Sequence, residues 1–265
     1  MPLSVYIEMI LKIIDIKKDT FHEISFLSSG SKGIVRECIL PFYKVHVEGL
    51  PKEIKAIVAT SDIQGREDGE KNRLLGEVVA EELFRLQKKG NIPKIDLAII
   101  GGDLYDYPDC RKLGGTGDVT DVWNTFALIF GKVVGVLGNH DIVDHGKLDS
   151  NVKILDASSI VSNGIRIGGV SGIIGRIDRN QRKEKAQYLK ALKDVSKDRN
   201  DIVVLHQGPD SPESGQIGEP LIREWLERNN IGIVIFGHRF WSNPFVAIGN
   251  NQVLNVGCRV FVFID

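Results

Sequence analysis

Polar side chains that could do chemistry stand at the ends of five short apolar runs in this chain. The runs lie in "KAIVAT", "IDLAIIGG", "KVVGVLG", "DIVVLH" and "IGIVIFGH", and each one is a predicted strand. The polar residues at or just after their ends are Asp62 and Gln64, Asp103 and Asp106, Asn139, His140 and Asp141, His206, and His238. Because the carboxyl ends of parallel strands meet at one edge of a sheet, these side chains are expected to converge.

Carboxylates, an amide oxygen and neutral imidazoles together form a ligand set suited to manganese, iron or zinc. A set made only of oxygens would suit calcium or magnesium instead. Taken singly, Asp62 could cap a helix, and His206 or His238 is more often a histidine satisfied at a strand end. The recurrence over five strands favours a divalent metal site.

Longer helical stretches separate these strands. In "NRLLGEVVAEELFRLQKKG", one helical face carries Leu74, Val78, Val79, Leu83 and Leu86. Further helices are predicted in "DVTDVWNTFALIF", "RKEKAQYLKALKDVS" and "EPLIREWLERNN". The alternation of strand and helix predicts a layered α/β architecture with a largely parallel core sheet.

Both ends of the chain have β character. Residues 1–53 predict a β-rich extension in which "SSGSKG" forms a turn, packed on the same single domain that spans residues 1–265. The final runs, "FVAIGNNQVLNVG" and "CRVFVFID", predict a terminal hairpin across Asn250 and Asn251.

The composition points to no particular class of partner. Lys and Arg number 34 against 35 Asp and Glu, so the charge balance does not indicate nucleic acid or an anionic membrane. No apolar run reaches the roughly 18 residues needed to cross a bilayer, so a cytoplasmic location without membrane contact is expected. The three cysteines lack the close spacing of a zinc or redox motif and are expected to be reduced.

The order of the polar motifs resembles that of the calcineurin-like metallophosphoesterases. That family carries Asp-x-His, Gly-Asp-x-x-Asp, Gly-Asn-His-Asp or Glu, a lone His, and Gly-His-x-His. In this chain Asp62 opens the first motif, "GDLYD" matches the second, "GNHD" the third, His206 the fourth, and Gly237 with His238 begins the last. The resemblance covers residues from about 54 to 240 and implies a four-layer αββα sandwich of two mixed β-sheets flanked by helices.

Two positions depart from the family pattern. Gln64 replaces the histidine of the first motif, and Phe240 replaces the second histidine of the last. By resemblance, the second metal keeps a complete ligand set of Asp103, Asn139, His206 and His238. The first metal keeps only Asp62 and the shared Asp103, with one carbonyl oxygen from Gln64. One firm site for Mn, Fe or Zn and one weak site are therefore expected.

The resemblance implies hydrolysis of a phosphomonoester or phosphodiester by metal-activated water. His140 would stabilise or protonate the leaving oxygen, Asp106 would orient the His140 imidazole, Asp62 would act as base or ligand, and Arg239 could contact the phosphate. The loops at residues 107–117 and 207–220 are expected to set the choice of phosphorylated substrate. The alternative is a protein-binding scaffold that has lost catalysis, which Gln64 and Phe240 favour.

Overall fold

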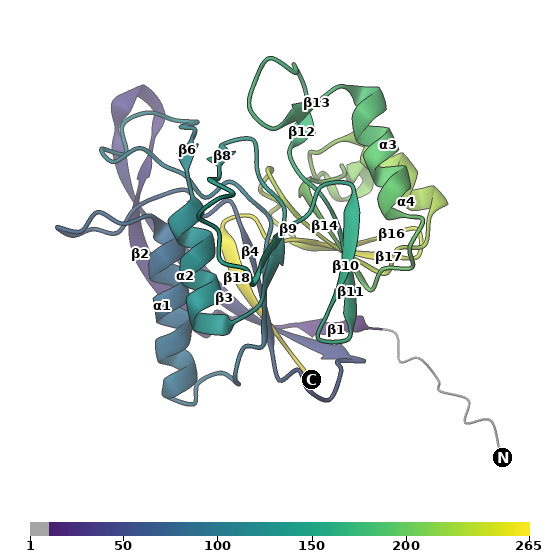
Figure 1. Ribbon diagram of the computed structural model, residues 1–265, viewed down its shortest axis with the longest axis horizontal. Helices are drawn as coiled ribbons and strands as arrows, with labels where there is room; N and C mark the ends of the chain where they lie inside the picture. The colour runs from purple at the N-terminus through teal and green to yellow at the C-terminus, as the bar shows by residue number, and fades with distance from the viewer. Residues whose placement is uncertain (1–10) are drawn as a thin grey trace.

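The computed structural model describes residues 11–265 and contains two large β-sheets packed face to face (Figure 1). The first sheet has eight strands, in the order β1 (Lys12–Ile16), β3 (Val35–Glu48), β18 (Arg259–Ile264), β4 (Ile57–Ser61), β5 (Leu97–Ile100), β7 (Val133–Gly135) and β9 (Val152–Ile154), with β2 (His22–Ser29) paired to β3. The second has six strands, in the order β10 (Ser158–Ser162), β11 (Ile165–Val170), β14 (Ile202–Gln207), β15 (Ile233–Gly237), β17 (Asn251–Asn255) and β16 (Phe245–Ile248). Two short pairs complete the described strands: β6 (Gly117–Asp118) with β8 (Asp141–Ile142), and β12 (Ile173–Ile174) with β13 (Arg182–Lys183).

Helices cover the outer face of each sheet. Figure 1 shows α1 (Leu75–Lys88) and α2 (Thr120–Phe130) against the first sheet, and α3 (Lys185–Val195) and α4 (Pro220–Arg228) against the second. Along β4, Ile57 and Ala59 pack into the core between the sheets, whereas Val58 packs toward α1 and α2. This period-two alternation of apolar side chains lets one strand fill two cores. The predicted αββα sandwich is confirmed.

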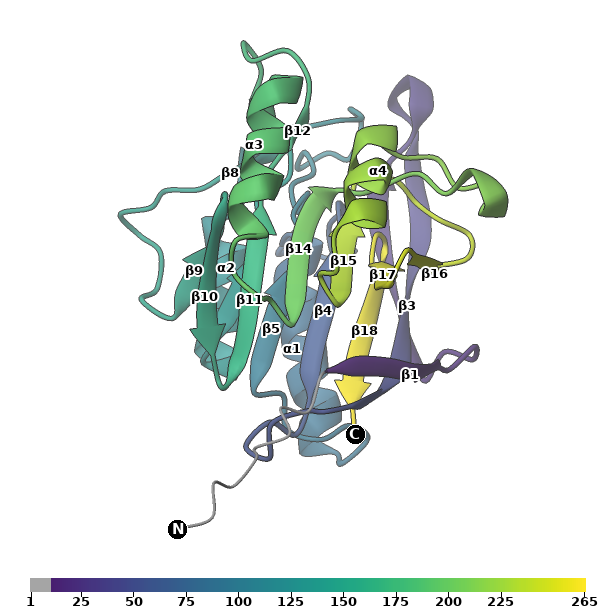
Figure 2. The same ribbon diagram turned by 90° about the vertical axis from the view of Figure 1, so that its right-hand side faces the viewer.

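Each sheet contains a block of four adjacent parallel strands. β4, β5, β7 and β9 run parallel in the first sheet, as do β11, β14, β15 and β17 in the second. The two sheets lie against each other with β4 beside β15 (Figure 2). The carboxyl ends of β4, β5, β14 and β15 therefore open toward a common region.

The N-terminal strands lengthen the first sheet. β2 and β3 form an antiparallel hairpin closed by a 3₁₀ turn at Ser31–Gly33, within the predicted "SSGSKG" turn. β3 then pairs in parallel with β18 and joins the hairpin to the main sheet. Residues 1–10 of the predicted extension lie outside the described residues, and the single-domain assignment stays a prediction.

The C-terminal strands differ from the prediction. β16 and β17 form a hairpin whose turn is Gly249–Asn250, with Asn251 already paired in β17. β17 and β18, however, belong to different sheets, because the chain crosses from the second sheet to the first after Asn255. The alternating side chains of β18 explain this position, since Phe261 and Phe263 enter the core between the sheets and Val260 and Val262 face the helices.

All four described α-helices are shorter than the stretches in which they were predicted. α1 begins after Leu74, which is buried, and Val78 is only half-buried. α3 begins at Lys185, because Arg182 and Lys183 pair with β12 instead. No helix within residues 11–265 has the length and apolarity needed to cross a bilayer.

Candidate metal centre

Four side chains from different strand ends meet between the two sheets. Asp103 follows β5, His206 lies in β14 and His238 follows β15, and these three offer ligand atoms that all lie within 4.8 Å of one another. The Nε2 atom of His206 lies 3.3 Å from Asp103 Oδ2 and 3.3 Å from Asn139 Oδ1. The structure thus brings together the four residues that the resemblance assigns to the second metal.

The orientation of His206 suits a metal ligand. Its side chain is fully buried, and its Nδ1 atom lies 2.8 Å from the carbonyl oxygen of Gly101. A proton on Nδ1 that is donated to this carbonyl leaves the lone pair of Nε2 directed at the oxygens of Asp103 and Asn139. A second hydrogen bond of this kind is what fixes the ring of a metal-binding histidine.

The charges in this group of side chains favour a bound cation. Burial acts to lower the pKa of His206, but the carboxylates of Asp103 and Asp62 outweigh it and raise that pKa to about 9. Desolvation, followed by the charge of His206, lowers the pKa of His238 to about 4, so this imidazole is neutral and free to coordinate. Since metal ligands must be deprotonated, a divalent cation would compete with the proton that His206 otherwise holds.

The backbone at the site is held in an uncommon conformation. Asp62, Asp103 and His238 have φ angles of 53°, 54° and 64°, in the left-handed region that non-glycine residues rarely occupy. Such strain is typical of functional sites, where the surrounding structure imposes it. Close packing also requires glycine at two neighbouring positions, because a Cβ atom at Gly138 would lie 2.1 Å from Asp103 Oδ1 and one at Gly237 would lie 2.1 Å from Asp62 Oδ2.

Asp141 connects the loop after β5 to the loop after β7 through hydrogen bonds. It is fully buried, and its Oδ2 accepts hydrogen bonds from the backbone N–H groups of Asp103 and Gly138 while its Oδ1 accepts one from Leu104, all at 2.8 Å. Burial, followed by the nearby Asp103 carboxylate, raises the pKa of Asp141 to about 6. Asn180, a residue that the sequence did not indicate, donates from Nδ2 to the Asp141 carbonyl at 2.8 Å and supports the same loop.

Asp62 lies beside the four-residue group. Its Oδ2 accepts hydrogen bonds from Ser61 Oγ at 2.7 Å and from the backbone N–H of His238 at 2.8 Å. Desolvation is the main cause that raises its pKa to about 7, and the Asp103 carboxylate adds to this effect. The Asp62 carboxylate therefore holds the loop that carries His238.

The two variant positions have other contacts. Gln64 donates from Nε2 to the carbonyl oxygen of Tyr105 at 3.2 Å. Phe240 is 62% exposed, and the guanidinium carbon of Arg259 lies 4.1 Å from its ring centroid. Neither side chain offers an imidazole nitrogen to a first metal ion.

The described residues show no hydrogen bond between Asp106 and His140, and the orienting role of Asp106 stays a prediction. Asp106 instead accepts from the backbone N–H and the hydroxyl of Ser29, at 3.0 and 2.6 Å, and from the N–H of Tyr107 at 2.8 Å. The Nδ1 atom of His140 lies 3.4 Å from Thr116 Oγ1. The β2–β3 hairpin makes this contact, because Ser29, the last residue of β2, donates two hydrogen bonds to the Asp106 carboxylate.

The remaining predicted site residue is Arg239, which was expected to contact the phosphate. Arg239 is exposed, and its side chain makes no hydrogen bond or ion pair with a described residue. Its charge contributes, after desolvation and His206, to the low pKa of His238. Arg239 thus lies near the metal centre without a partner of its own within residues 11–265.

Replacing Ser29 with alanine tests the link between the hairpin and the site. The change removes the hydroxyl that donates to Asp106 and should lower the free energy of unfolding by about 1 kcal/mol. Ser25→Ala is the matched control, because Ser25 is exposed on the same strand and should change stability by less than about 0.5 kcal/mol. Urea unfolding of both variants gives the comparison, and equal stabilities would show that the hydroxyl contributes nothing.

Fold and site together define an α/β sandwich with a histidine and carboxylate centre at its strand ends. Residues 55–239 match the calcineurin-like phosphoesterase family, and the chain belongs to that family.

A solved structure has the same fold. TT1561 of Thermus thermophilus has a TM-score of 0.51 and 15% sequence identity, over 77% of this chain and 89% of that one. A purple acid phosphatase from yellow lupin (Lupinus luteus) seeds has a TM-score of 0.44 and 14% identity, over 86% of this chain and 48% of that one. At these identities the likeness to TT1561 shows the fold alone. No curated protein sequence matches the chain significantly.

Proposed function

We propose that this protein is a metal-dependent phosphoesterase that acts on a phosphomonoester or phosphodiester. Membership of the calcineurin-like family suggests a hydrolase that uses divalent metal. The observation that carries the proposal is the approach of His206 Nε2 to both Asp103 Oδ2 and Asn139 Oδ1 at 3.3 Å.

The residues present fit one transition metal ion. Asp103, Asn139, His206 and His238 would hold it through one carboxylate, one amide oxygen and two imidazoles, a mixture that suits Mn, Fe or Zn. When bound, such an ion would supply Lewis acidity to a water molecule and to the phosphoryl oxygens. A second ion would find only Asp62, Asp103 and the amide oxygen of Gln64, and should bind weakly.

The protein's own groups would handle the protons of the reaction. The attacking water forms a bond to phosphorus and gives a proton to Asp62 as the P–O ester bond breaks. The leaving oxygen takes a proton from His140, whose Nε2 is available because Nδ1 lies beside Thr116. Arg239 would contact a phosphoryl oxygen, since its side chain has no described partner near the centre.

The second candidate function is a scaffold that binds another protein. Three observations favour it: Gln64 bonds to Tyr105, Phe240 lies on Arg259, and Ser29 occupies Asp106. Gln64 and Phe240 stand where the family resemblance places two metal-binding histidines, and Asp106 is bonded to Ser29 instead of His140.

Metal analysis and hydrolysis separate the two functions. Protein purified without chelator should contain about one Mn, Fe or Zn per chain, and it should hydrolyse a generic aryl phosphodiester across a manganese titration. A flat baseline at millimolar metal would favour the scaffold.

Restoring the two missing histidines should strengthen the first metal site. Gln64→His combined with Phe240→His would add two imidazoles beside Asp62, and hydrolysis is expected to rise at least about 10-fold, with saturation at lower manganese concentration. The control is Leu128→His, because Leu128 is 85% exposed on α2, and this variant should leave hydrolysis unchanged. An unchanged baseline in the double variant would instead support the loss of catalysis.

A further inference from the structure

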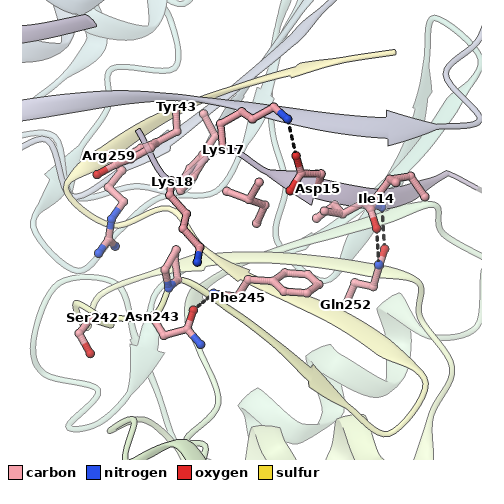
Figure 3. A pocket seen from close by; sticks show the side chains of 14 residues that line it. Ile14, Asp15, Lys17, Lys18, Tyr43, Ser242, Asn243, Phe245, Gln252 and Arg259 are labelled. Carbon is pink, nitrogen blue, oxygen red and sulfur yellow. Dashed lines mark hydrogen bonds and ion pairs between the residues drawn. The ribbon is translucent and has the colours of Figure 1, made fainter. Parts of the chain in front are cut away.

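A cavity of about 640 Å³ lies between the open edges of the two sheets (Figure 3). β1, β3 and β18 of the first sheet form one wall, and β16, β17 and the segment Ser242–Pro244 form the other. Its volume is within the range of small-molecule sites in proteins. None of the four residues of the candidate metal centre lines it.

The walls of this cavity are fixed to each other. The side chain of Gln252 on β17 accepts from the backbone N–H of Ile13 and donates to the Ile13 carbonyl, both at 2.7 Å (Figure 3). β1 is thereby held to both sheets, since it also pairs with β3. The site is preformed, which lowers the cost of ordering protein when a ligand binds.

Two positive charges that line the cavity lack an acidic partner. Arg259 is only 5% exposed, and its guanidinium donates to the carbonyl oxygens of Trp241 and Gly257 and to the amide oxygen of Asn255. Lys18 makes no hydrogen bond or ion pair with any residue in the range 11–265. The third cation, Lys17, is paired with Asp15 at 2.6 Å. A buried cation without a carboxylate partner is costly, so an anion at Arg259 would stabilise the protein.

Aromatic side chains form the apolar part of the lining. The rings of Tyr43 and Phe261 are stacked, with centroids 5.4 Å apart and an interplanar angle of 27°. Phe245 lines the opposite wall on β16. Aromatic faces of this kind bind flat rings through stacking and burial of apolar area.

We propose that this cavity binds a small organic anion with a planar ring. The anionic group would lie against Arg259 and Lys18, and the ring would pack on Tyr43 and Phe245. This binding site is separate from the proposed hydrolytic function. It lies near the metal centre, because Arg259 pairs with Ser61, the residue before Asp62. Phe240 also joins the two regions, since it stacks on Arg259 two residues after His238.

Calorimetric titration of metal-free, chelator-treated protein tests the site without involving the metal centre. The probes are adenosine 5′-monophosphate and 4-hydroxybenzoate, each an anion with a planar ring. At least one of the two probes should bind with a Kd below about 1 mM. If the nucleotide binds, its uncharged counterpart adenosine, which lacks the phosphate, should bind at least about 10-fold more weakly. If neither probe reaches this affinity, the proposal is wrong.

Charge reversal at Lys18, two residues after β1, locates the bound probe. Lys18→Glu should weaken binding at least about 10-fold, whereas Lys12→Glu, the same change at an exposed residue of β1 outside the cavity, should alter it less than about 2-fold. Both side chains are exposed, so melting temperatures should match that of the unmodified protein. Equal effects of the two changes would overturn the assignment.

The variant Asp103→Ala distinguishes binding in the cavity from binding at the metal centre. Binding of the probe should be unchanged in this variant even where hydrolysis is lost. Loss of probe binding in Asp103→Ala would place the ligand at the metal centre and contradict a separate site. Failure of hydrolysis in the unmodified protein, with probe binding intact, would count against the proposed function alone.

Discussion

Protein with Asp103 replaced by alanine should lose both its bound metal and its hydrolytic activity. Asp103 is 3% exposed, and its Oδ2 faces His206 Nε2 while its Oδ1 accepts from the backbone N–H of His140. Its removal takes away the only carboxylate of the four-residue ligand set and should reduce metal affinity by more than about 100-fold. Elemental analysis after purification without chelator, together with hydrolysis of an aryl phosphodiester, measures both losses.

The control for this change is Asp121→Ala. Asp121 is an exposed acid on α2, and neither metal content nor hydrolysis should change when it is replaced. If Asp103→Ala retained about one equivalent of metal, the cation would be held elsewhere in the protein.

Replacing Asp141 with alanine is expected to have the largest effect on stability. Three backbone N–H groups, from Asp103, Leu104 and Gly138, would lose their acceptor inside the protein. Each buried donor without a partner costs about 1–3 kcal/mol, so a loss of about 3–5 kcal/mol is expected after partial relaxation. Urea unfolding measures it, and Asp121→Ala should differ from the unmodified protein by less than about 0.5 kcal/mol. A loss below about 1 kcal/mol for Asp141→Ala would mean that the loops hold without this carboxylate.

The elements could be predicted because their side chains repeat locally. β4 alternates between two cores, and α1 presents Val79, Leu83 and Leu86 to the first sheet at helical spacing. The assignment of strands to two sheets is different, since β4 and β15 are both five-residue strands buried along their whole length, and distant pairing partners place them in different sheets. Local patterns carry no information on that pairing, and the family resemblance supplied it. The same limit explains why β18 was expected beside β17 instead of between β3 and β4.

The centre of the site could be predicted because strand ends position it. Asp103, His206 and His238 each lie at or beside the carboxyl end of a parallel strand, which fixes where they meet. Ser29 could not be predicted in the same way, because its contact with Asp106 joins residues 77 positions apart and depends on how the β2–β3 hairpin docks. Thr116 lies in a loop whose path has no sequence pattern, so its approach to His140 also appears only in the structure.

Anomalous X-ray scattering from a crystal grown with Mn²⁺ would test the central claim most directly. The account predicts one strong peak per chain, within bonding distance of Asp103 Oδ2, Asn139 Oδ1 and His206 Nε2, with at most a weak second peak near Asp62. Absence of a peak among these atoms at millimolar Mn²⁺, or a single peak at another place in the chain, would contradict it.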